Sequence, residues 1–302
     1  MKINILRSDK IYEKILAAAY DKRDDIFRYE LMAPFKKKWD CYRIPLKAKT
    51  PGGYDIIMAC RMTGLLTPSA FTGDTARQNA LLSDDLLWKR CEDAIALSLS
   101  EFEKAGYDLP VKEYLFSLLL ADADNAYTVM NEGYCGDGGI PGSIMAWLIP
   151  GDDTLPRIHA AIAHEVHHNV RFQYVKWHDD ITLGEMIVSE GLAENFAVEL
   201  YGKEFAGPWV TRTGRDTVDE IKGTIRRNLG VQGLNSLNAY LYGDDMASLQ
   251  GLSPVGMPYC AGYACGYHLV RLFLDRTGLT AARAADIPAE EILSQTEDFW
   301  NG

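Results

Sequence analysis

The amino-acid sequence predicts an α+β fold, with a mixed first half followed by a mainly helical second half. Short segments rich in strand-forming residues occur only before residue 151. Beyond residue 155, apolar residues recur at helical spacing in five successive segments: 156–176, 183–202, 214–228, 261–277 and 288–296. With 302 residues, the chain is long enough to bury a substantial core.

The elements of the first half follow from local patterns. Residues 10–39 mix charged and apolar positions at helical spacing, and residues 84–105 form a well-defined helical pattern that opens with acids. Residues 41–47 and 54–60 are short and rich in strand formers, so we expect strands there. The apolar run at 112–124 predicts a buried strand.

A glycine-rich segment, NEGYCGDGGIPG, covers residues 131–142. Its glycines do not follow the GxGxxG spacing of a phosphate-binding loop, and the strand-like run SIMAWLIP (143–150) follows it instead of a helix. We therefore expect a mobile loop that leads into a strand.

Composition and charge narrow the possible functions. The net charge of -11 argues against a nucleic-acid-binding face, and we expect the short basic run Lys36-Lys37-Lys38 to be a solvated surface. The N-terminus lacks the apolar stretch of a secretory signal, and no run reaches the roughly 18 to 20 apolar residues that span a bilayer. The six cysteines include no CxxC pair and are expected to be reduced thiols. These observations predict a cytoplasmic protein without a membrane or nucleic-acid partner.

The stretch AIAHEVHHNVRFQ, residues 161–173, contains three of the six histidines. At about 100° per residue on a helix, His164, Glu165 and His168 fall within one arc of about 100°, while apolar residues occupy the opposite side. Pairing His164 with His167 is also conceivable, but Glu165 favours His168. The result is the H-E-x-x-H arrangement, in which two histidines bind zinc and the glutamate acts on water. His167 is then expected to be a packing or supporting residue.

A third ligand is expected on the next helix. Thr182, with Glu185 three residues later, forms a capping-box pattern that predicts where this helix begins. Glu190 and Glu194, four residues apart, share a face that is otherwise small or apolar. Two carboxylates on such a face are costly unless they are paired or bound to a metal, although a solvated surface is the alternative.

These motifs carry a resemblance to known proteins. HEVHH followed by SEGLAENFA resembles the gluzincin branch of the zincin metallopeptidases, of which thermolysin is a member. HEVHH, EGLAE and GYACGYHLV together resemble more closely a bacterial family of predicted zinc-dependent proteases, catalogued as a domain of unknown function. The resemblance implies that residues 111–302 form a zincin-like catalytic region, whereas residues 1–110 form a mixed α/β region without a recognised motif.

The resemblance also implies a role for individual residues. His164, His168 and Glu190 match the ligands of one Zn²⁺ ion, and Glu165 matches the general base. Glu194 matches the acid that hydrogen-bonds a ligand histidine, although thermolysin has aspartate there and a slightly shorter spacing to the glutamate ligand. The implied function is hydrolysis of peptides or unfolded proteins, and the strand at 143–150 would be the edge strand that binds substrate backbone.

An oxyanion donor is expected in PYCAGYACGYHLV, residues 258–270. Aromatic packing between helices is the alternative interpretation of its tyrosines. The family's GY..GY signature matches Tyr263 and Tyr267, so the resemblance favours these two over His268. A non-catalytic zinc-binding protein that binds a regulatory partner is the competing function, and the intact Glu165 argues against it.

Overall fold

The computed structural model describes residues 1–301, which form two compact units. The first unit comprises residues 1–97 and 111–165, and the second comprises residues 98–110 and those from 166 onward. The label η marks a 3-10 helix, except that η1 is a π-helix. The elements of the first unit are β1 (Lys2–Ile5), α1 (Ser8–Ala17), α2 (Tyr20–Ile26), η1 (Phe27–Met32), η2 (Ala33–Phe35), α3 (Lys36–Cys41), α4 (Ile56–Met62), η3 (Pro68–Ala70), α5 (Thr75–Leu82), β2 (Glu113–Leu120), α7 (Ala126–Met130), β3 (Tyr134–Ile140), β4 (Ser143–Leu148) and η4 (Leu155–Arg157).

The second unit is helical in the described residues. Its elements are α9 (Leu183–Tyr201), η5 (Lys203–Phe205), α10 (Pro208–Thr211), α11 (Arg215–Arg227), α12 (Leu234–Tyr242), α13 (Asp244–Leu249), α14 (Ala261–Thr277), α15 (Ala289–Gln295) and η6 (Glu297–Trp300). Two helices cross the boundary between the units: α6 (Asp85–Lys104) and α8 (Ile158–Tyr174), the latter after Glu165. The predicted α+β class and the five helices of the second half are confirmed. The division of function at residue 110 stays a prediction.

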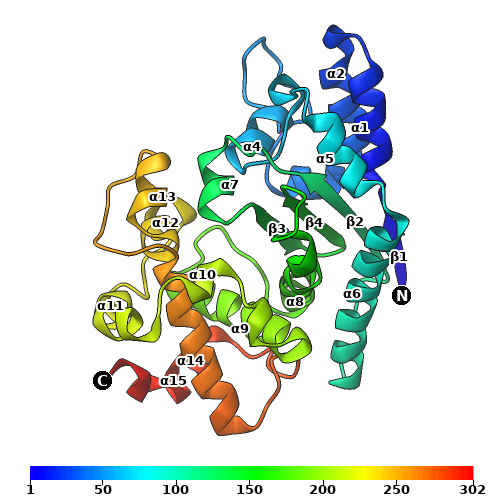
Figure 1. Ribbon diagram of the computed structural model, residues 1–302. Coiled ribbons are helices and arrows are strands. Elements are labelled where there is room, and N and C mark those ends of the chain that lie inside the picture. The colour runs from blue at the N-terminus through cyan, green and yellow to red at the C-terminus, as the bar shows by residue number, and fades with distance from the viewer. Residues whose placement is uncertain (302) are drawn as a thin grey trace. The chain divides into compact units, whose positions relative to one another are not determined.

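The first unit contains a four-stranded sheet with the strand order β1-β2-β4-β3 (Figure 1). Strands β1, β2 and β4 run parallel, and β3 pairs antiparallel with β4. Every residue of β4 is buried, as expected for a central strand, and its sequence is correspondingly apolar. The expectation that residues 143–150 form the edge strand was therefore wrong, because β3 occupies that edge.

Three other sequence expectations fail in the first unit. Residues 54–60 form most of α4 instead of a strand, because the Asp55 side chain accepts hydrogen bonds from the N–H groups of Ile57 and Met58 and starts a helix. Residues 41–47 form no strand: Cys41 ends α3, and residues 42–47 are turn and irregular structure. Residues 134–140 of the glycine-rich segment are strand β3 rather than a loop.

The basic run on α3 is only partly a solvated face. Lys36 and Lys37 are exposed, but Lys38 is fully buried, so the expectation was wrong for Lys38. Its ammonium group lies 2.5 Å from the carboxylate of Asp137 in strand β3.

Helix α9 is the central helix of the second unit. Thr182 and Glu185 form the expected capping box at its start, and all residues from Leu183 to Ala197 except Glu185 are buried. An α-helix that is buried all round needs close neighbours on several sides. Helix α14 supplies one of them, and the two helices cross closely (Figure 1).

The crossing of α9 and α14 depends on two glycines. A methyl group at Gly191 would collide with the carbonyl oxygen of Gly266, and one at Gly266 would collide with the carbonyl oxygen of Ile187. Both collisions involve backbone atoms, which cannot move independently of their helices. Gly191 and Gly266 therefore set the distance between the helices, and Gly191 directly follows Glu190 in the chain.

We expect Gly266→Ala to lower the free energy of unfolding by about 2 kcal/mol, because the added methyl forces α14 away from α9. Gly223 on α11 is a matched control, since the nearest atom to a methyl group there is a side-chain nitrogen at 3.6 Å. Gly223→Ala should raise stability by about 0.5 to 1 kcal/mol through the helix preference of alanine. Urea unfolding of both variants is the measurement, and equal effects would contradict the role of Gly266.

Candidate metal centre

Helix α8 places His164, Glu165 and His168 on one of its faces, and all three side chains are largely buried. The opposite face carries Val166 and Val170, which are fully buried. The two-sided pattern expected from the sequence is therefore present. A helix with polar side chains buried on one face requires partners for those side chains.

Glu190 on α9 is one such partner. Its Oε2 atom lies 3.2 Å from Nε2 of His168, and potential ligand atoms of His164, His168 and Glu190 lie within 4.8 Å of one another. His164 stands one turn before His168 on the same uninterrupted helix. The structure thus brings the three expected ligand side chains together.

The donor set fits a zinc ion. Two imidazole nitrogens and one carboxylate form a common ligand set of catalytic zinc, and three protein ligands leave a coordination position open. All three residues are at least nine-tenths buried, which favours binding of a cation over solvation of the carboxylate. Coordination could therefore offset the cost of burying Glu190.

Ser189 is a partner that sequence reasoning missed. Its hydroxyl lies 3.2 Å from Nδ1 of His168, on the opposite side of the ring from Glu190. Such a contact on the second ring nitrogen fixes the orientation of a ligand histidine. The signal in the sequence was its position directly before Glu190 in SEGLAE.

Strand β3 passes directly over Glu165. The N–H group of Gly138 donates a 2.6 Å hydrogen bond to Oε2 of Glu165. A methyl group at Gly136 would lie 2.5 Å from Cγ of Glu165, and one at Gly138 would collide with the backbone carbonyl of Glu165. The glycines of the segment 131–142 therefore permit a close approach between a strand and helix α8.

The comparisons with known proteins agree with this geometry. The family model described as "Predicted Zn-dependent protease (DUF2268)" matches residues 87–294, which include α8, α9 and α14. The chain belongs to this family. The expected family of predicted zinc-dependent proteases is thereby confirmed.

Two Bacillus subtilis (strain 168) proteins are similar to this chain. The uncharacterized protein YjfC is 41% identical over 286 residues, which cover 94% of each chain. The uncharacterized protein YjaZ is 28% identical over 151 residues, which cover 49% of this chain and 54% of YjaZ. No solved structure matches the chain. Among the described residues, no helix is both long and apolar enough to cross a membrane.

Glu194, one turn after Glu190 on α9, is almost completely buried. It accepts hydrogen bonds of 2.7 Å from the N–H group of Gly207 and 2.6 Å from the indole N–H of Trp209. These bonds connect α9 to the start of α10 and compensate for the burial of the charge. The role of Glu194 beside a ligand histidine stays a prediction.

The tyrosines of α14 have partners within the second unit. The Tyr263 hydroxyl donates to the Tyr242 hydroxyl at 3.4 Å, and the two rings pack 5.5 Å apart. Burial, and then the negative charge of Glu194, raises the pKa of Tyr267, whose ring packs edge-on against His268 at 5.3 Å. Aromatic packing is therefore part of their role, and their function as oxyanion donors stays a prediction.

His167 lies in the core of the second unit. Its ring packs against both Phe102 and Phe196, with centroid distances of 5.7 and 5.6 Å, and its Nε2 atom is 3.4 Å from the carbonyl oxygen of Ala281. The expectation of a packing role for this histidine agrees with its position. The six cysteines form no disulfide bond in the described residues.

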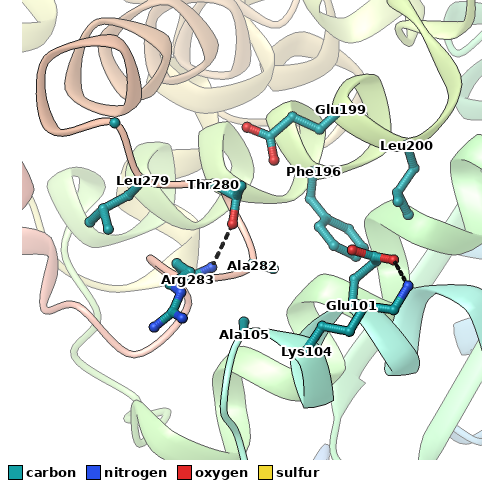
Figure 2. A pocket seen from close by; sticks show the side chains of 11 residues that line it. Glu101, Lys104, Ala105, Phe196, Glu199, Leu200, Leu279, Thr280, Ala282 and Arg283 are labelled. Atoms are coloured by element: carbon teal, nitrogen blue, oxygen red, sulfur yellow. Dashed lines mark hydrogen bonds and ion pairs between the residues drawn. The ribbon is translucent and has the colours of Figure 1, made fainter.

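A separate cavity of about 450 Å³ lies in the second unit (Figure 2). Its lining includes the ion pair Lys104–Glu101, Arg283 and Glu199. Burial raises the pKa of the Glu199 carboxyl group. Glu199 accepts a 2.9 Å hydrogen bond from the N–H group of Ala281. None of the expected metal ligands lines this cavity.

The two strand glycines that face Glu165 give a paired prediction. We expect Gly138→Ala to lower the free energy of unfolding by about 2 kcal/mol, because its methyl meets the backbone of α8. Gly136→Ala should cost less than about 1 kcal/mol, since it meets a side chain that can rotate away. Thermal unfolding of both variants is the measurement.

Gly151→Ala is the control for this pair, because a methyl group there has no neighbour within 4 Å. Its unfolding midpoint should match that of the wild type. A Gly138→Ala variant as stable as the control would show that there is room for a methyl group between β3 and the backbone of α8.

Proposed function

We propose that this protein is a zinc peptidase of the gluzincin type that hydrolyses peptides or unfolded proteins. The supporting observation is the buried cluster of His164, His168 and Glu190, with Glu165 next to the first ligand in the chain. The membership in a family of predicted Zn-dependent proteases agrees with this function. A structural zinc site with four protein ligands would not need the additional glutamate.

The proposed roles follow from the chemistry of each group. His164, His168 and Glu190 would hold one zinc ion, which when bound polarises a carbonyl group and lowers the pKa of water to about 7. Glu165 would accept the proton of the attacking water and return it to the leaving amine. The Gly138 N–H group would keep the Glu165 carboxylate in place while it is ionised.

The proposed substrate class follows from the sheet. Strand β3 lies at the edge of the sheet and is the strand in contact with Glu165. An extended peptide can add to an edge strand through backbone hydrogen bonds, which recognise any sequence. We therefore expect side-chain preferences to be weak, and unfolded segments to be better substrates than folded proteins.

Stabilisation of the developing oxyanion is assigned to Tyr263 and Tyr267 on the resemblance of GYACGY to the family signature. The phenol of Tyr267 is half-buried, and its raised pKa keeps it protonated, as a hydrogen-bond donor must be. The net charge of -11 makes a nucleic-acid substrate unfavourable.

Glu165→Gln tests the general base. We expect zinc to remain bound at one ion per chain, because the three ligands are unchanged, while hydrolysis of a denatured protein such as casein falls by at least about 10²-fold. The measurements are metal analysis and a peptide-release assay. Wild-type protein that binds zinc but cleaves no peptide in a broad panel would instead be a non-catalytic zinc-binding protein.

Glu190→Ala tests the third ligand. Loss of one of three ligands should weaken zinc binding by about 10²-fold or more. Losing a residue that only supports a ligand already lowers metal affinity by about 10- to 100-fold. Competition with a chelator measures this affinity. Glu199→Gln removes a carboxylate from the same helix outside the site and should leave zinc affinity unchanged. A Glu190→Ala protein that retains zinc as tightly as this control would refute the assignment.

A further inference from the structure

We propose that Lys38, Asp137 and Tyr42 are positioning residues for Glu165, and that they act by fixing a bulge in strand β3. This inference rests on the proposed peptidase function. It assigns a role to part of residues 1–110, which carry no recognised motif and of which the family model matches only residues from 87 onward.

The bulge lies where β3 meets Glu165. In the pairing of β3 with β4, Asp137 is opposite Met145, but Ile140 is opposite Ser143, so β3 contains one extra residue. The two residues between these pairs are Gly138 and Gly139. A bulge bends a strand and changes the direction of its N–H groups. Here the redirected Gly138 N–H group donates to the Glu165 carboxylate.

The side chain of Asp137 holds the bulge from within. Its Oδ1 atom accepts a 3.0 Å hydrogen bond from the N–H group of Gly139. This bond to the residue two positions later closes a turn of the kind that aspartate favours. A change in the orientation of the Asp137 carboxylate therefore changes the conformation of both glycines.

Helix α3 fixes that carboxylate from outside the strand. The fully buried Lys38 ammonium lies 2.5 Å from Asp137 Oδ1 and donates a 3.1 Å hydrogen bond to the Asp137 backbone carbonyl. The Tyr42 hydroxyl donates to Asp137 at 3.0 Å, and its ring lies 5.1 Å from the Lys38 ammonium. Both the side chain and the backbone of Asp137 are thus held by two residues one helical turn apart.

The electrostatics of the cluster agree with a fixed, ionised Asp137. Burial alone would raise the pKa of Asp137, but the Lys38 charge and the hydrogen bonds hold this pKa below its usual value. Burial and the nearby carboxylates of Asp137 and Glu165 raise the pKa of Tyr42 well above its usual value. Tyr42 therefore stays a hydrogen-bond donor throughout the neutral range.

Three variants separate positioning from folding. Lys38→Met removes the link between α3 and the strand but leaves Asp137 without its cation. The double variant Lys38→Met/Asp137→Asn removes both charges, and the asparagine can still accept from Gly139. Tyr42→Phe removes one hydroxyl from a partly exposed position. Lys36→Met is the matched control, because it breaks an exposed ion pair with Asp40 on the same helix.

For Lys38→Met and the double variant, we expect kcat to fall by about 10- to 100-fold, since small displacements of a catalytic group have effects of this size. For Tyr42→Phe we expect a fall of about 3- to 10-fold, because one of several bonds to Asp137 is lost. KM and the zinc content should match the wild type. The Lys36→Met control should keep the kcat of the wild type.

Amide hydrogen exchange at Gly138 supplies a measurement that does not need activity. Exchange should become faster in the double variant and in Glu165→Ala, and should not change in Lys36→Met. A double variant with wild-type kcat and wild-type exchange would overturn the proposal, as would a loss of kcat explained fully by lost zinc. If the wild type hydrolyses no peptide, the proposed function fails, and the exchange rates alone decide whether Lys38 and Asp137 position the strand.

Discussion

The contact between strand β3 and Glu165 is the constraint on which the first unit depends. A backbone N–H group reaches a side-chain carboxylate on helix α8 only if strand and helix approach more closely than side chains permit. That approach requires glycine at position 138, where a methyl group would meet the backbone of α8, whereas a methyl group at position 136 would meet only the Glu165 side chain. Because glycine weakens a strand, the strand needs other support. The all-buried strand β4 beside it and the side chain of Asp137 supply that support.

In the second unit, a close contact between two helices positions Glu190. Glu190 lies beside His168 on a helix that is buried all round. Burying a carboxylate in such a helix is unfavourable in free energy unless the carboxylate has a partner. The glycine pair Gly191 and Gly266 brings α14 against the residue that follows Glu190, so this part of α9 cannot shift along its axis. Close glycine contacts thus fix both the helix that carries the proposed third ligand and the strand over the proposed general base.

Local patterns revealed the parts of the site that lie within single helices. The spacing of His164, Glu165 and His168 needed only helical periodicity, and the start of α9 needed only the local pattern of Thr182 and Glu185. The choice of Glu190 over Glu194 as the third ligand came from the family resemblance. The sequence predicts a loop at residues 134–140, but they form strand β3. Their glycines permit a contact with helix α8, and local strand propensity carries no information about such a distant contact. Lys38 was mistaken for a surface residue because its partner, Asp137, is remote in the chain. Non-local contacts therefore account for these errors.

The rotation of α8 about its own axis depends on contacts of two residues that lie beside the proposed ligand residues on the helix, His167 and Arg171. His167 and Arg171 are one turn apart, and both contact backbone carbonyls of the segment 281–287. Burial lowers the pKa of Arg171 to about 10, so the side chain remains charged at neutral pH and its bonds to Ala285 and Ile287 are charge-assisted. These contacts hold one face of α8 against the core of the second unit. Because side chains on a helix have fixed angular offsets, the same contacts direct His168 toward Glu190.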